Sequence, residues 1–331
     1  MLNFSFPPPP GIYAPAVLFF HHESEDIDWE SYAKHILWLA ESGVTGVLIE
    51  VLNGEALHLS RSERSKPISF ARETLDSAGY QSVMVIAETE AQSASETKEL
   101  CAEAHEAGAG WVSVSTPNTW NTALTVNEIV AFHSDVASSS PIPYMIHNLP
   151  TVTTGIDSDS DIVSELAVHP DIVGTRLSCG SFCEIQRLSA EFDYQSTFAT
   201  FAGQSDILLH TLLAGGAGVI GALVNVLPRV HVKIYQLFLE YQQDPSRNGS
   251  KLADAFVLQR QVAAAEWVVW KIGGLAVVRA IVARQFGYGY GMMRGQSLSV
   301  SLDKLVQSDV DTKEGKWWKT VQDMIDIENS L

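Results

Sequence analysis

Short apolar runs alternate along the first 243 residues with stretches in which apolar side chains recur at helical spacing. The apolar runs predict strands buried on both faces, which is typical of parallel sheets. They lie at residues 12–20, 44–51, 82–88, 110–115, 142–148, 172–175, 195–202 and 218–224. Eight strands, each followed by a helix, indicate an α/β fold of the (β/α)8 TIM-barrel type.

Helix starts are marked by side chains that can cap them. Asp28 precedes a helical pattern that ends at Gly43. The sequence has three further Ser/Thr-x-x-Glu patterns of the capping-box form, which start at Ser60, Ser93 and Thr125. Pro67 predicts that the first of these three helices is kinked or begins late, since proline lacks the amide hydrogen that a helix interior needs.

A polar segment at residues 244–250 separates two regions of the chain. Residues 1–243 are expected to form the barrel, preceded by a short arm that contains the four prolines 7–10. Residues 251–331 are expected to form a C-terminal helical extension with helices at 252–270, 275–285 and 316–327. Trp267 and Trp270 are most simply interpreted as core residues of the first of these helices.

Composition narrows the range of partners. The net charge is −18, and the sequence has no block of lysines and arginines that could bind along a phosphate backbone. Nucleic acid is therefore not expected as a partner. The three cysteines cannot form a disulfide framework, and neither they nor His21, His22 and Glu23 have the spacing of a metal site. No membrane segment or secretion signal is recognised, so the protein is expected to be cytoplasmic. Neither a cofactor nor a metal is expected.

The run at 172–175 leads directly into a charged residue, Arg176. A buried arginine is costly unless it meets a partner or a ligand, and the carboxyl ends of parallel strands are where α/β proteins bind ligands. Arg176 is therefore a candidate site residue. The alternative is a structural ion pair that closes this end of the sheet.

Several motifs resemble those of the dihydrodipicolinate synthase / N-acetylneuraminate lyase family of class I aldolases, especially its fungal members related to 4-hydroxy-2-oxoglutarate aldolase. Residues 51–55 resemble the family's Gly-Thr-Thr-Gly-Glu loop, residues 147–150 its Tyr-Asn-x-Pro, and residues 172–176 its Ile-Val-Gly-x-Lys. Residues 203–206, 215–220 and 225 resemble its last two strands. The resemblance spans nearly the whole chain and implies the barrel fold and a homotetramer built from dimers.

The residues that carry the family's chemistry differ. The resemblance implies a Schiff-base lysine where this chain has Arg176, and a proton-relay tyrosine where it has His147. A guanidinium stays protonated and cannot act as the amine nucleophile. None of the ten lysines lies in a predicted strand. Small or hydroxyl-bearing family residues are replaced by larger apolar ones at Leu18, Val51, Leu52 and Trp120.

These substitutions predict a more apolar pocket and a lyase-like enzyme that acts non-covalently on an apolar, enolisable carbonyl compound. His147 would be the acid/base, and Arg176 would hold a carboxylate or an enolate. The expected substrate-binding residues are Leu18, Val51, Leu52, Asn53, Gly54, Trp120, Gly203 and Ile220. Isomerisation, cyclisation, and carbon–carbon cleavage or formation, as in secondary metabolism, all stay open. The alternative is an inactive relative that binds a metabolite or a partner protein.

Overall fold

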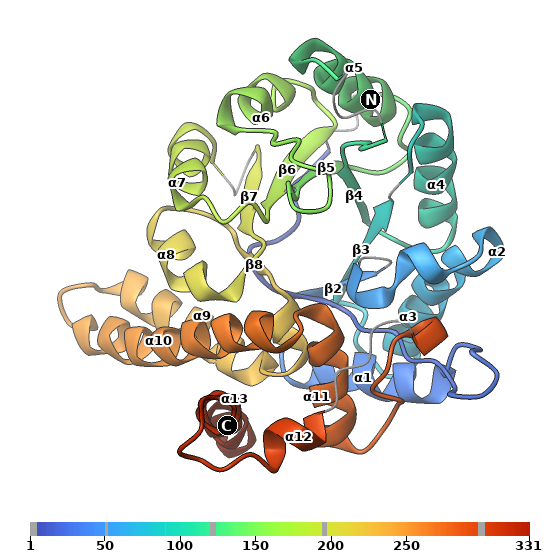
Figure 1. The fold of residues 1–331 in the computed structure, drawn as a ribbon. Helices are drawn as coiled ribbons and strands as arrows, with labels where there is room; N and C mark the ends of the chain where they lie inside the picture. The colour runs from blue at the N-terminus through green and yellow to red at the C-terminus, as the bar shows by residue number, and fades with distance from the viewer. Residues whose placement is uncertain (1–4, 50–51, 90, 120–123, 194–196, 297–301) are drawn as a thin grey trace.

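The computed structural model describes residues 5–49, 52–89, 91–119, 124–193, 197–296 and 302–331. Its centre is a closed barrel of parallel strands in sequence order, with β8 paired to β1 (Figure 1). The strands are β1 (Gly11–Pro15), β2 (Gly46–Ile49), β3 (Met84–Thr89), β4 (Trp111–Ser115), β5 (Tyr144–Asn148), β6 (Ile172–Leu177), β7 (Ala199–Ala202) and β8 (Gly218–Ile220). The predicted TIM barrel is confirmed.

Helices surround the barrel, as Figure 1 shows. They are α1 (Trp29–Glu41), α2 (Arg61–Arg64), α3 (Lys66–Ser77), α4 (Ala94–Glu106), α5 (Val126–Ala137), α6 (Ser160–Leu166), α7 (Phe182–Glu191), α8 (Leu208–Leu213) and α9 (Pro228–Gln243). The predicted caps at Asp28, Ser93 and Thr125 accept backbone N–H groups, and Ser60 forms a capping box. Pro67 is the second residue of α3, two positions after Ser65, which separates α3 from α2.

The C-terminal residues form α10 (Gly249–Ile272), α11 (Leu275–Phe286), α12 (Leu302–Val306) and α13 (Lys313–Ser330), which lie together beside the barrel near α9 (Figure 1). The prediction that Trp267 and Trp270 are core residues is wrong, because their exposed fractions are 53% and 50%. The buried face of α10 carries smaller residues such as Val262, Ala265 and Val269. In the described part of the chain, no helix is long and apolar enough to cross a membrane.

The first and the last strand end well before their apolar runs do, and β2, β3, β5 and β7 begin two or more residues after theirs. The first run continues through Phe20, but β1 ends at Pro15, and residues 16–20 leave the sheet while staying buried. Phe19 there packs edge-on against Tyr288, which follows α11. The last run continues through Val224, but β8 ends at Ile220 and a 3-10 turn follows. The C-terminal helices bury such segments, so hydrophobicity alone does not distinguish them from strands.

Apolar side chains fill the inside of the barrel. This interior cluster contains Tyr13, Leu48, Ile86, Met145, Ala199, Phe201, Ala217 and Ile220. In a filled barrel, ligands bind above the packed layers, at the carboxyl ends of the strands. The strand residues that follow this layer are therefore the ones that can form a site.

Asn225, after β8, joins the barrel to the first helix layer. Its Oδ1 accepts the backbone N–H of Val17 at 3.2 Å and lies 2.9 Å from Nε2 of His35 in α1. Its Nδ2 donates to the carbonyls of Pro15 and Ala222, both at 2.9 Å. The side chain is fully buried, so each of these groups depends on the amide for its hydrogen bond.

We expect Asn225→Ala to lower the free energy of unfolding by roughly 2–4 kcal/mol, because it leaves several buried polar groups unsatisfied. Asn127→Ala, at an exposed position of α5, is the control and should have little effect. Urea unfolding followed by circular dichroism measures both. Equal stability of the two variants would show that the Asn225 contacts contribute little.

Candidate active site

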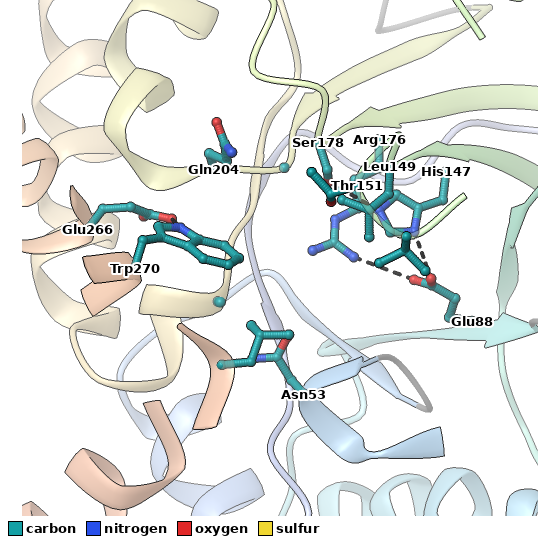
Figure 2. A pocket seen from close by; sticks show the side chains of 14 residues that line it. Asn53, Glu88, His147, Leu149, Thr151, Arg176, Ser178, Gln204, Glu266 and Trp270 are labelled. Atoms are coloured by element: carbon teal, nitrogen blue, oxygen red, sulfur yellow. Dashed lines mark hydrogen bonds and ion pairs between the residues drawn. The ribbon is translucent and has the colours of Figure 1, made fainter. Parts of the chain in front are cut away.

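A cavity of about 370 Å³ opens at the carboxyl ends of the strands. Figure 2 shows its polar wall, formed by side chains of the barrel, facing residues of α10. The lining comes from three regions: strand ends and the turns after them, the loop after β5, and the C-terminal helices. Its residues are Asn53, Glu88, His147, Leu149, Thr151, Val152, Arg176, Ser178, Gly203, Gln204, Ala222, Glu266, Trp270 and Leu275.

Strand alternation explains why three polar side chains meet here. In β3 and β5, Ile86 and Met145 point into the filled interior, so the residues two positions later, Glu88 and His147, point inward one layer higher. Arg176 of β6 is the register partner of His147. His147 and Arg176 therefore lie side by side near the carboxyl ends of two adjacent strands.

Glu88 joins the two predicted residues. Its Oε1 lies 2.7 Å from Nδ1 of His147, and its Oε2 lies 3.4 Å from Nη1 of Arg176. All three side chains are more than nine-tenths buried. The carboxylate thus sits between a neutralising cation and an imidazole, and holds both in place (Figure 2).

The protonation states follow from burial and from these contacts. Burial alone would raise the pKa of Glu88, but the attraction of His147 and Arg176 and the hydrogen bonds it accepts lower it below its usual 4.5. Burial, together with the charge of Arg176, lowers the pKa of His147 below 6.5, against the opposing effect of Glu88. At neutral pH the site therefore contains an ionised Glu88, a neutral His147 and a charged Arg176.

The hydrogen bonds fix the orientation of the imidazole. Because an ionised carboxylate only accepts, Nδ1 of His147 carries the hydrogen, and Nε2 has a free lone pair. Nε2 lies 3.1 Å from Oγ of Ser178, in the turn after β6, and the hydroxyl can donate to it. Ser115 of β4 adds a contact of 3.3 Å on the Nδ1 side. Nε2 is therefore the basic atom of this wall.

Two hydrogen-bond donors of the cavity wall have no partner among the described residues. Arg176 donates from Nε to the carbonyl of Ile220 at 3.1 Å and from Nη1 to Glu88, and within the described residues Nη2 donates to nothing. Nδ2 of Asn53 is buried and likewise unpaired in the described part of the chain. Both can donate to a carboxylate or an enolate oxygen.

The remaining predicted binding residues lie in different places. Gly203 lines the cavity, whereas Ile220 contributes only its carbonyl to Arg176 and packs its side chain in the interior cluster. Leu18 and Gly54 do not line the cavity. They border a separate small void with Ala16, Tyr32 and Ile49, because the chain after β1 turns toward α1.

The structure does not describe the side chains of three predicted binding residues. Val51 and Trp120 lie outside the described residues. Leu52 begins the 3-10 turn Leu52–Gly54, but its side chain is not among those described.

The sequence interpretation missed Glu88, Ser178 and the C-terminal contribution to the site. Glu88 is the last residue of a predicted strand, and Ser178 stands two positions after Arg176, so both were detectable as polar residues at strand ends. Glu266 and Trp270, both of α10, carry no local signal for a barrel site. Burial raises the pKa of Glu266 to about 7, with Asp206 contributing.

A group of potential metal ligands lies outside the cavity lining. Among the described residues, Asp157, Cys179 and Glu184 are the group of His, Cys, Asp or Glu side chains whose ligand atoms come close together. Sγ of Cys179 and Oε2 of Glu184 are 3.5 Å apart, so these side chains satisfy each other in part. Burial raises the pKa of both groups, which opposes the ionised forms that bind metals.

Comparisons with known proteins agree with the barrel fold and find relatives that are named as aldolases. Residues 9–257 match the model of the dihydrodipicolinate synthetase family. The chain is 38% identical, over 85% of its length and 86% of the other protein's, to a probable mitochondrial 4-hydroxy-2-oxoglutarate aldolase of Emericella nidulans. It is 36% identical to an L-threo-3-deoxy-hexylosonate aldolase of Hypocrea jecorina, covering 85% and 88%.

A crystal structure of a protein assigned to the dihydrodipicolinate synthase family from Coccidioides immitis has a similar fold. Its TM-score is 0.81, its sequence identity is 31%, and the match covers 98% of both chains. The similarity therefore includes the C-terminal helices, two of which line the cavity.

We expect Glu88→Gln to lower the free energy of unfolding at pH 7 by roughly 3–5 kcal/mol, because it leaves the buried Arg176 without its counter-ion. The pKa of Glu88 is lowered, so this stabilisation is present above pH 4.5 and is lost as the pH falls through the folded value. Glu99→Gln, at an exposed ion pair of α4, is the control. Urea unfolding at pH 7 and below pH 4 tests both points. An equal loss in both variants at pH 7 would contradict the account.

Proposed function

The chain belongs to the dihydrodipicolinate synthetase family, and on that basis we propose that it is a lyase that acts on an enolisable carbonyl compound without a Schiff base. His147 is the base, oriented by Glu88, and Arg176 holds the negative oxygen. The observation that carries this proposal is the contact of Glu88 with both residues at the cavity wall. The named relatives are aldolases, which makes carbon–carbon cleavage or formation the preferred reaction class.

The positions of the lysines support a mechanism without an imine. All ten lie in helices, on α1, α3, α4, α9, α10, α12 and α13. None is among the described residues that line the cavity. Arg176 occupies the strand position where the resemblance implies the amine, and its guanidinium cannot form an imine with a ketone.

Proton transfer follows from the orientation of the imidazole. Nε2 of neutral His147 removes a proton from the carbon beside a carbonyl group, either directly or through the hydroxyl of Ser178. The resulting imidazolium is stabilised by Glu88 at Nδ1. The enolate oxygen accepts hydrogen bonds from Nη2 of Arg176 and Nδ2 of Asn53, neither of which has a partner in the described part of the chain.

The cavity also offers apolar surface to a substrate. Its apolar lining residues are Leu149, Val152, Ala222, Trp270 and Leu275, of which Leu149 lies beside His147 and Arg176 and Trp270 lies across the cavity from them (Figure 2). A substrate with a polar, oxygen-bearing end and an apolar remainder matches this lining. In the alternative, an inactive relative that binds a metabolite or a partner protein, the same donors would hold a ligand, but the imidazole that Glu88 orients would have no chemical role.

Treatment with pyruvate and borohydride should leave the intact mass of the protein unchanged, because the site has no amine to form a reducible imine. Mass spectrometry measures this, with a class I aldolase treated in parallel as the positive control. A stable adduct of pyruvate on any lysine of this chain would refute the mechanism without a Schiff base.

The protein should accelerate exchange of the C3 protons of 4-methyl-2-oxopentanoate, a 2-oxo acid with an apolar chain, for deuterium in D2O. His147→Ala and Arg176→Ala should each slow this exchange by roughly 100-fold or more, and the double variant should be little slower, since the two act on one transition state. Proton NMR measures the rates, with His105→Ala at an exposed position as control. Exchange at the wild-type rate in folded single variants would exclude the proposed roles.

A further inference from the structure

Ser178, His147 and Glu88 are arranged in line, in the order nucleophile, base and carboxylate. Oγ of Ser178 lies 3.1 Å from Nε2 of His147, and Nδ1 of the same ring lies 2.7 Å from Glu88. We propose that Ser178 is a nucleophile that accepts an acyl group, so that the site also catalyses acyl transfer. This activity uses the same imidazole as the proposed lyase reaction but goes beyond it, since it adds a covalent step at a residue that the sequence analysis did not consider.

The geometry around the imidazole meets the requirements of a catalytic triad. The carboxylate fixes the hydrogen on Nδ1, so Nε2 can accept the hydroxyl proton of Ser178. The lowered pKa of His147 keeps it neutral and available as a base at neutral pH. These groups stand on β3, on β5 and directly after β6, which are rigid parts of the barrel.

The turn that carries Ser178 is held from two sides. Its backbone N–H donates to the carbonyl of Asn148 at 2.8 Å, and the N–H of Gly203 donates to the carbonyl of Leu177 at 2.7 Å. Oγ of Ser178 occupies the space that a Cβ at residue 203 would need. Gly203 therefore leaves room for the hydroxyl next to the cavity, where Ser178 belongs to the lining (Figure 2).

Donors for the tetrahedral oxyanion line the same cavity. Nη2 of Arg176 has no partner among the described residues, and neither does Nδ2 of the buried Asn53. Arg176 lies two residues before the nucleophile and shares its side of the cavity in Figure 2. A cation near the developing negative charge is an established way to stabilise such an intermediate.

The reaction needs only water as a co-reactant. As Oγ bonds to the acyl carbon, its proton passes to Nε2 of His147, and the carbonyl π-electron pair moves onto oxygen. When that pair re-forms the carbonyl, the bond to the leaving group breaks, and the leaving group takes the proton from Nε2. Water then attacks the acyl-serine with the same proton path, which releases a carboxylic acid and restores Ser178.

The substrate class is an ester or a 1,3-dicarbonyl compound with a short apolar acyl chain. Both contain an acyl carbon bonded to a leaving group that can carry negative charge, as an alkoxide or an enolate. The chain would lie along Leu149, Val152 and Trp270, and the volume of about 370 Å³ limits its length.

The test uses a fluorophosphonate, which reacts with activated serines, and 4-nitrophenyl butyrate as the ester. We expect the fluorophosphonate to label Ser178 in the wild-type protein, identified by peptide mass mapping, and to block ester hydrolysis. Ser178→Ala should abolish both, and His147→Ala should lower both rates by roughly 100-fold or more. Ser205→Ala is the matched control, because Ser205 is also buried but does not line the cavity.

Labelling of a residue other than Ser178, no labelling at all, or equal hydrolysis by folded Ser178→Ala would overturn the proposal. Peptide mapping of the wild-type protein gives an answer even if a variant fails to fold. Deuterium exchange by the wild-type protein is measured separately. Exchange without labelling overturns only the acyl-transfer proposal, whereas labelling without exchange overturns only the proposed lyase reaction.

Discussion

The site depends on one buried carboxylate. Glu88 is 3% exposed, and its charge is tolerated because Arg176 neutralises it and His147 and Ser115 are within hydrogen-bonding distance of it. The same contacts fix the tautomer of His147 and hold the guanidinium against the cavity wall. Removing any one of the three charged or basic groups would leave the others imperfectly paired, so structural and chemical roles are coupled here.

The fold was largely predictable from the sequence because each barrel strand lies in an apolar run bounded by turns, and the first six strands are each followed by a helix with a capping side chain. His147 and Arg176 were recognisable as polar residues at strand ends. Glu88 and Ser178 were equally close to strand ends, but their importance appears only when β3, β5 and β6 are brought together. Trp270 and Glu266 reach the cavity from α10, a contact between distant segments that no local pattern encodes.

The C-terminal helices complete the site as well as the core. Trp270 and Leu275 supply part of the apolar lining, and Arg279 of α11 forms a buried ion pair with Glu55, which follows the Asn53 turn. Arg294, which follows α11, binds Glu63 and the carbonyl of His58. These contacts connect the extension to the loop that carries Asn53, so the extension positions a residue of the polar wall.

The central claim is that Glu88, His147 and Arg176 act together on the substrate: His147 removes a proton, and Arg176 binds the substrate oxygen that becomes negatively charged. Calorimetric titration with oxalate, a planar dianion that resembles an enolate of a 2-oxo acid, in buffers of different ionisation enthalpy tests it most directly. Because an anion beside His147 raises its lowered pKa, binding at pH 7 should take up a proton, and Arg176→Ala should abolish binding. Absence of binding to the wild-type protein, or binding without proton uptake that Arg176→Ala leaves unchanged, would contradict the account.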